Sequence, residues 1–180
     1  MDYDISALKV LFKKIFPPKK CIFTVDTSGD GNADSLLIRA FNVVMAIEIP
    51  PEIELGGFST KDFNLKRFDL KDYGKLYIDE NPVTIAKDEF NVEAIKNQFL
   101  IYHKGESFTI DDLLGGNLAG RIIALGDTIN ILIKIKSEGI KKFTKGKHKL
   151  IFESELIPKL EFEFELDDSN LNIEFHPEEL

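Results

Sequence analysis

The acidic segment from Val25 to Ser35 has the residue types and spacing best suited to binding a metal ion. It places oxygen-bearing residues at alternate positions around Gly31, and a glycine at that place permits a sharp bend. A hard cation such as Ca²⁺ takes about six to eight oxygen ligands, which loops of this form supply from side chains and one main-chain carbonyl. The segment therefore predicts a calcium site. Its ligands would be Asp26, Ser28, Asp30, Asp34 and the carbonyl oxygen of Asn32.

The residues on either side of this segment indicate that it joins two β-strands. Residues 21–25 and 35–41 are rich in β-branched and aromatic side chains, which favour strands. An EF-hand is not expected, because its loop lies between helices and ends with a bidentate glutamate, where this chain has Leu37.

The segment resembles the acidic calcium hairpins of FG-GAP and integrin-α repeats and, more loosely, thrombospondin type 3 repeats. In those families the aspartates and the glycine hold the ion, and the resemblance implies this role for Asp26, Asp30, Asp34 and Ser28. The match covers about ten residues and occurs once, whereas those families repeat the unit. It therefore supports a calcium site but not membership of any of these families. The alternative is a turn whose polar side chains bond to their own backbone without a metal.

Composition limits the classes of protein to which the chain can belong. At 180 residues it is long enough to bury a sizeable core, and we expect a single domain over residues 1–180. Its 23 basic and 31 acidic residues give a net charge of −8, which disfavours the broad phosphate contact of nucleic-acid binding. The single cysteine, Cys21, cannot form an internal disulfide, so the fold does not depend on an oxidising compartment.

No targeting or membrane segment is evident in the sequence. Residues 1–4 lack the charged start and apolar stretch of a signal peptide, and no apolar run reaches the roughly 18 residues of a transmembrane helix. We therefore expect a protein without a signal peptide or transmembrane segment, resident in the cytoplasm or in a particle assembled there.

One amphipathic helix is predicted over about residues 4–16, before strands that begin at about residue 21. Its apolar residues recur at helical spacing, and Pro17 and Pro18 end it. The apolar positions are Leu8, Leu11, Phe12, Ile15 and Phe16. Lysines make its other side basic, so the helix either covers the end of a sheet or contacts a partner or an anionic lipid surface.

The rest of the chain predicts β-strands. Residues 37–49 are apolar on both faces, which indicates one central strand, and residues 99–110 form a hairpin. Residues 128–136 and 160–166 alternate strongly between apolar and polar side chains, and a last strand is expected within 171–175. Short strands with polar turns are typical of an all-β, antiparallel β-sandwich, jelly-roll-like or immunoglobulin-like.

Residue sets that could support catalysis are sparse. His103, His148 and His176 lack the spacing of a zinc motif, and we expect them on the surface. The glycine-rich residues 115–121 depart from a phosphate loop, because Arg121 stands where such a loop has lysine. We therefore predict a protein that is not an enzyme.

The favoured function is a non-enzymatic structural or assembly subunit, of the kind that builds a capsid, tube or surface layer. Its partners would be further copies of itself or another protein. A ligand- or carbohydrate-binding sandwich is the alternative. Residues 6–16, 37–41 and 45–50 also resemble, faintly, the first helix and strands of sliding clamps, which implies a less favoured role beside DNA.

Overall fold

The computed structural model describes residues 5–52, 54–55, 58–59, 75–83, 99–153 and 159–180. It is mostly β, with 44% strand against 13% helix, so the predicted predominance of strands is confirmed. The helices are α1 (Ile5–Ile15), α3 (Ile110–Leu114), α4 (Ser137–Ile140) and the 3₁₀ helix η4 (Pro177–Glu179). The strands are β1 (Ile22–Asp26), β2 (Ser35–Phe41), β3 (Ile47–Glu48), β4 (Glu54–Leu55), β5 (Phe58–Ser59), β6 (Lys75–Ile78), β7 (Asn81–Pro82), β8 (Phe99–His103), β9 (Glu106–Thr109), β10 (Ile122–Ile123), β11 (Thr128–Lys134), β12 (Gly146–Glu153), β13 (Leu160–Leu166) and β14 (Ile173–Glu174).

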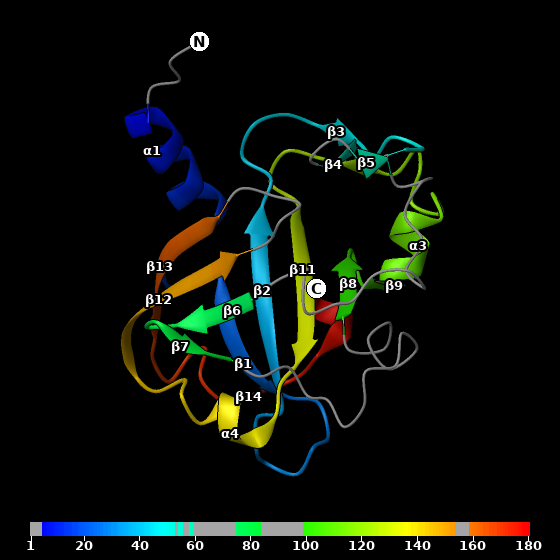
Figure 1. Cartoon of the computed structure of the whole chain (residues 1–180). Coiled ribbons are helices and arrows are strands. Elements are labelled where there is room, and N and C mark those ends of the chain that lie inside the picture. Colours follow the sequence, from blue (N-terminus) through cyan, green and yellow to red (C-terminus); the bar gives the residue numbers. More distant parts are fainter. Residues whose placement is uncertain (1–4, 53, 56–57, 60–74, 84–98, 154–158) are drawn as a thin grey trace.

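The larger sheet has six strands in the order β14-β1-β2-β11-β8-β9 (Figure 1). Its central strand β2 pairs antiparallel with both β1 and β11, through registers such as Ile22 with Ile38 and Leu132 with Leu37. Successive β2 side chains point to opposite faces, and both Leu36 and Leu37 are buried. The prediction of a central strand covered on both sides is therefore confirmed for β2.

The smaller sheet has four strands in the order β13-β12-β6-β7. Along β13, Phe164 and Leu166 are buried whereas Glu161 and Glu163 are exposed, which is the alternation expected from the sequence. Glu163 lies opposite Lys149 of β12, and the Lys149 ammonium lies 2.7 Å from the Glu161 carboxylate. The polar face of this sheet thus pairs opposite charges across strands.

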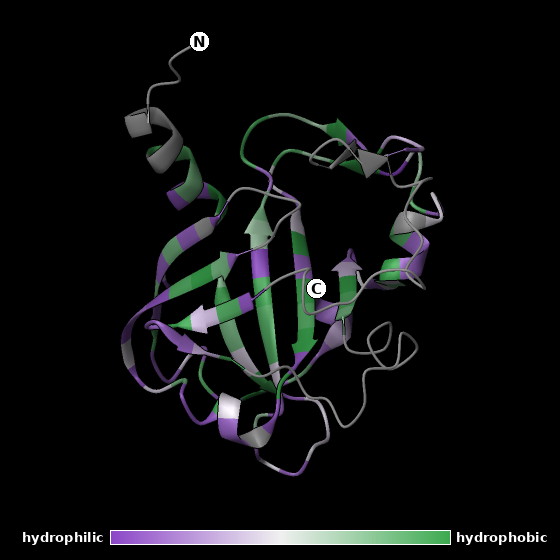
Figure 2. Ribbon diagram, viewed as in Figure 1, coloured by the Kyte–Doolittle hydropathy of each residue, from purple (hydrophilic) through white to green (hydrophobic). Residues whose placement is uncertain are grey.

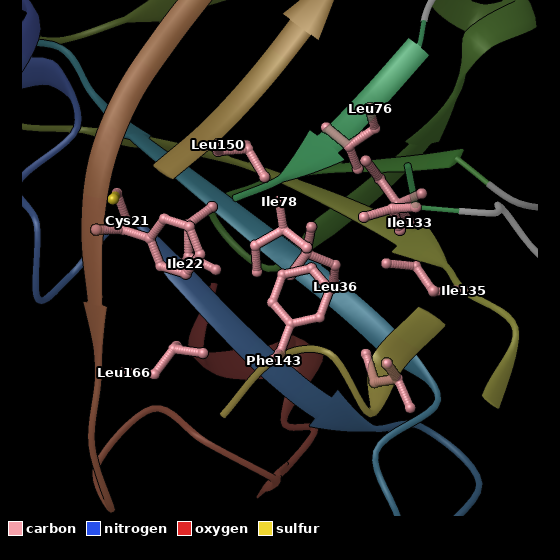
Figure 3. Packing of buried hydrophobic residues seen from close by; sticks show 13 residues of the cluster. Cys21, Ile22, Leu36, Leu76, Ile78, Ile133, Ile135, Phe143, Leu150 and Leu166 are labelled. Carbon is pink, nitrogen blue, oxygen red and sulfur yellow. The ribbon is translucent and has the colours of Figure 1, made fainter. Parts of the chain in front are cut away.

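Two hydrophobic clusters cover the two faces of the larger sheet. The first takes residues from both sheets, including Ile22 and Leu36 from the larger and Ile78, Leu150 and Phe164 from the smaller (Figure 3). The second lies on the opposite face and consists of Val25, Leu37, Tyr102 and Leu132, with Phe175 and Leu180 packed against it. Figure 2 shows the matching apolar colouring along the central strands. The C-terminal segment therefore helps to cover the second face.

The C-terminal segment differs from the expected antiparallel strand. Residue Ile173 pairs with Val25 in parallel, so β14 joins the larger sheet beside β1 instead of extending a hairpin with β13. Asn170 explains the change of direction, because its buried amide donates to the carbonyl oxygens of Glu165 and Lys19 and its oxygen accepts from the Asp167 amide. The sheet is therefore mixed rather than purely antiparallel.

The strand predicted over residues 37–49 is also shorter than expected. β2 ends at Phe41, and the chain then turns at Asn42 before the two-residue strand β3, which pairs with β10. The predicted hairpin at 99–110 is confirmed as β8 and β9, but Ile110 begins α3. Thr109 caps that helix by a reciprocal capping box with Asp112.

Helix α1 precedes the sheets and ends at their edge (Figure 1). Phe16, which follows it, stacks on Phe162 of β13 with ring centroids 4.7 Å apart. None of the helices within the described ranges has the length and apolar character needed to cross a bilayer. The sequence also predicts a strand over residues 63–68 and either a helix or a strand over residues 88–98, and both ranges fall outside the described residues.

Candidate functional site

The predicted calcium ligands lie in the hairpin that connects β1 to β2. Asp26 ends β1, and Gly29 and Gly31 have φ angles of 75° and 86°, in the left-handed region that favours glycine. The Asp26 carboxylate accepts hydrogen bonds from the amides of Ser28 (3.0 Å), Gly29 (2.8 Å) and Gly31 (2.6 Å). Burial opposes ionisation of this carboxyl, but these donors outweigh it and lower the pKa of Asp26.

The other two aspartates of the hairpin anchor separate parts of it. The Asp30 carboxylate accepts the Asn32 amide at 2.8 Å. The Asp34 carboxylate accepts the hydroxyl groups of Thr27 at 2.8 Å and Ser35 at 2.7 Å. Each side chain therefore closes its own turn, as the interpretation without metal expects.

A calcium ion would need these oxygens to converge on one point. Within the described residues, no group of three or more His, Cys, Asp or Glu side chains is placed to hold a metal ion. The hydrogen bonds that Asp30 and Asp34 accept leave lone pairs on their carboxylates that can also bind a cation. Calcium binding by Asp26, Ser28, Asp30, Asn32 and Asp34 therefore stays a prediction.

The hairpin is braced by the C-terminal segment. The Asn172 side-chain amide donates to the Gly31 carbonyl oxygen at 3.0 Å, and the Phe175 amide donates to the Asp26 carbonyl oxygen at 3.2 Å. The shape of the hairpin and the position of β14 are therefore linked.

A buried polar network at the other end of the larger sheet centres on His103, at the end of β8. This histidine is 4% exposed, so its predicted surface position is wrong. Its Nε2 lies 3.2 Å from Asp127 Oδ2, and its Nδ1 lies 3.4 Å from an Arg121 guanidinium nitrogen. Because guanidinium only donates, Nδ1 accepts and Nε2 carries the proton that faces Asp127.

Asp127 holds the loop that leads into β11. The Lys104 ammonium, the Ala124 amide and the His103 ring all donate to its carboxylate, at 2.9, 2.8 and 3.2 Å. These donors outweigh the effect of burial and lower the pKa of Asp127 to about 2. The carboxylate is therefore ionised over the physiological range.

Arg121, the last residue of the glycine-rich segment, also makes contacts that stabilise the fold. It forms an ion pair with Glu106 and lies over the Phe108 ring, with its guanidinium carbon 4.3 Å from the centroid. These contacts join the segment to β9, in keeping with the sequence argument against a phosphate loop.

His148 is half-buried rather than fully exposed. Its side chain is 8% exposed, and its two ring nitrogens lie 2.7 Å from Asp79 Oδ2 and 2.7 Å from the Thr144 carbonyl oxygen. Neither buried histidine could have been located from the sequence, because their acidic partners lie 24 and 69 positions away. Only His176 of the three is exposed, as expected.

Five exposed apolar residues lie on the segment that follows β2 and on β10 and the turn after it, at a place that the sequence did not indicate. We define the apical apolar surface as Val44, Met45, Ile47, Ile122 and Leu125, which are 54%, 64%, 47%, 56% and 63% exposed. They come from two segments, residues 44–48 and 122–125, which meet where β3 pairs with β10 (Figure 1). Figure 2 shows the apolar colouring of β3.

Asn42 and Asp127 fix the backbone beneath the apical apolar surface. The Asn42 side-chain amide donates to the carbonyl oxygens of Met45 (2.6 Å), Ile123 (2.9 Å) and Ala124 (3.1 Å). The Asn42 amide donates to the Asp127 carbonyl oxygen at 2.9 Å, and the Gly126 amide donates back to the Asn42 carbonyl oxygen at 2.8 Å. The two segments are therefore preorganised, and an arrangement of this kind can dock another apolar surface with little loss of entropy.

Comparison with known proteins adds no relative to this description. No protein-family model matches the chain, and no curated protein matches its sequence. The function is therefore argued from the chain itself.

Proposed function

We propose that this protein is a non-enzymatic assembly module, a single-domain β-sandwich that associates with further copies of itself. The observation that carries the proposal is the apical apolar surface, which presents five large exposed side chains on two adjoining segments. Exposed apolar residues that concentrate on one part of a soluble protein mark an interaction site more often than scattered ones do.

The arrangement of the polar groups supports the same proposal. Structural donors hold three acids of the described chain: the buried Asp26 by its own hairpin, the exposed Asp79 by His148, and the half-buried Asp127 by Lys104. These bonds fix turns and loops. The exposed apolar residues near β3 and β10, in contrast, have no such structural role within the described chain.

The fold inferred for the module is a sandwich of the two sheets. The first hydrophobic cluster draws on strands of both, which is how sandwich cores are built. In this proposal the hairpin between β1 and β2 stiffens one end of the sandwich, and Ca²⁺ is the ion that its oxygens would select.

Mass in solution tests the proposal. We expect light scattering, over protein concentrations from about 1 to several hundred micromolar, to show a defined oligomer in equilibrium with the monomer. A chain that stays monomeric over this range contradicts self-assembly. If the monomer were also retained on a DNA column at physiological salt, the clamp-like alternative would be favoured instead.

A further inference from the structure

We propose that Arg39, Asn130 and Tyr102 form a binding site for the carboxylate of a small organic acid. The three residues stand in one row across the larger sheet, because Arg39 of β2 pairs with Asn130 of β11, and Asn130 pairs with Tyr102 of β8. Paired residues point to the same face of a sheet, here the face of the second hydrophobic cluster. Figure 2 shows polar colouring that interrupts the apolar colouring of β2 and β11. Such a site is separate from the proposed assembly role and does not require it.

Arg39 is held in a way that leaves the end of its guanidinium group for a ligand. Its Nε donates to Asn130 Oδ1 at 2.7 Å, and its guanidinium carbon lies 4.8 Å from the centroid of the Phe23 ring. The side chain is half-buried, and burial lowers the pKa of Arg39. Among the residues that the structure describes, no acceptor bonds to its two terminal nitrogens and no carboxylate pairs with its charge. A partly desolvated cation of this kind gains most from an anion.

The other two residues of the row also have donors without acceptors. Asn130 is fully buried, and its side-chain nitrogen donates only to the Thr128 hydroxyl, at 3.3 Å, which leaves one N–H group. Tyr102 is 6% exposed, yet its phenol makes no hydrogen bond in the described part of the chain, and burial raises the pKa of Tyr102. A buried tyrosine usually has a partner for its O–H group. The row therefore combines three adjacent side chains with donors to spare.

The chemistry of the row selects a carboxylate. A ligand that meets spare donors must accept hydrogen bonds, and the two terminal nitrogens of a guanidinium match the two oxygens of a carboxylate. Arg39 is the one charged side chain of the three, so the row supplies a single positive charge. That charge balances a monocarboxylate and leaves a phosphate dianion only half neutralised.

The residues around Arg39 favour an acid with an apolar body. Phe23 of β1 lies against the guanidinium group and is half-buried. Phe41 is two residues further along β2, so it points to the same face as Arg39, and it is also half-buried. A carboxylate on Arg39 can therefore place its carbon skeleton against an aromatic ring.

Titration of the full chain with benzoate, followed by nuclear magnetic resonance, tests the site. We expect millimolar benzoate to shift the signals of the Arg39 Nε–H group and the Asn130 side-chain amide until they saturate. Arg39→Met removes the donors and the charge, so it should raise the benzoate dissociation constant at least about tenfold. Lys147→Met is the matched control, because it removes a positive charge from an exposed lysine of β12, and it should leave the constant unchanged.

Tyr102→Phe separates a binding role from a structural one. The change removes one O–H group and keeps the ring, so it should weaken benzoate binding by about threefold. The melting temperature of the ligand-free protein should not fall, because the O–H group loses no partner within the described structure. A lower melting temperature with unchanged benzoate binding would overturn the assignment of Tyr102 to the site.

The remaining outcomes decide the site and its ligand class. Benzoate that shifts neither signal overturns the site, as does an Arg39→Met protein, folded by circular dichroism, that binds benzoate as tightly as the wild type. If Arg39→Met does not fold, Arg39→Lys keeps the charge without the paired donors and should weaken binding likewise. Inorganic phosphate that binds as tightly as benzoate overturns the choice of a carboxylate. Light scattering of the ligand-free protein tests self-assembly by itself, so the failure of either proposal leaves the other standing.

Discussion

The side-chain amide nitrogen of Asn42 lies 2.9 Å from the carbonyl oxygen of Ile123, a residue 81 positions further along the chain. The same nitrogen lies 2.6 Å from the carbonyl oxygen of Met45. One side chain therefore joins the segment that follows β2 to β10, by donating to main-chain acceptors of both.

Replacement of Asn42 should loosen that end of the molecule. We expect Asn42→Ala to lower the free energy of unfolding by about 1–3 kcal/mol, because partly buried carbonyl oxygens lose their donor. Urea denaturation measures the loss. Asn117→Ala is the matched control, since its exposed amide donates only to Asp112, and it should cost less. Equal losses in the free energy of unfolding would show that the Asn42 contacts contribute no more than one exposed hydrogen bond.

The pKa of Asp127, at about 2, predicts how stability responds to acid. The folded pKa lies below the unfolded value near 4, so the ionised carboxylate stabilises the fold above about pH 4, and this contribution is lost as pH falls through 2. Asp127→Asn should therefore be less stable than the wild type at pH 7, and the difference should shrink toward pH 2. Denaturation at several pH values tests this, with the exposed Asp168→Asn as the control. A difference that does not vary with pH would contradict it.

The burial pattern of β13 predicts that substitutions at two neighbouring positions have very different effects on stability. Phe164 is fully buried between the sheets, so Phe164→Ala should cost about 3–5 kcal/mol through the cavity that it leaves. Glu163 is exposed on the other face, and Glu163→Ala should change stability by no more than about 0.5 kcal/mol. Thermal or chemical unfolding distinguishes them, and similar costs would mean that the register of β13 is different.

If the hairpin binds calcium, the ion should stabilise the folded protein and so raise its melting temperature. Millimolar Ca²⁺ would raise the melting temperature of the wild type, and Asp30→Ala would abolish that increase. Asp26→Ala should lower stability with or without calcium, because Asp26 holds the amides of Gly29 and Gly31 in this conformation. A wild-type melting curve unaffected by calcium would leave the hairpin as a turn stabilised by its own side chains.

The parts of the fold that the sequence predicts are those governed by local periodicity. Alternation of apolar and charged residues was sufficient to locate β13, and a continuous apolar run was sufficient to identify β2 as a central strand. The β8–β9 hairpin could be found for the same reason, since Lys104 and Gly105 form its turn between two apolar stretches. These signals lie within a few residues of the elements that they specify.

The parts that could not be predicted depend on contacts between distant residues. The apolar run of β2 continues beyond Phe41, so nothing local shows that Asn42 leaves the strand to bond with Ile123. His103 follows the apolar residues of β8 and is buried because Asp127 and Arg121 arrive from a later loop. The parallel pairing of Ile173 with Val25 likewise requires knowledge of where the two ends of the chain meet.

The single thiol of the chain gives direct access to its unfolding kinetics. Cys21 lies immediately before β1 and is fully buried in the first hydrophobic cluster, so a reagent reaches it only after that part of the core opens (Figure 3). In excess reagent the labelling rate therefore equals the rate of that opening, and in dilute reagent it reports the free energy of opening. Every substitution discussed above can thus be assessed at one native atom, in native buffer and without denaturant.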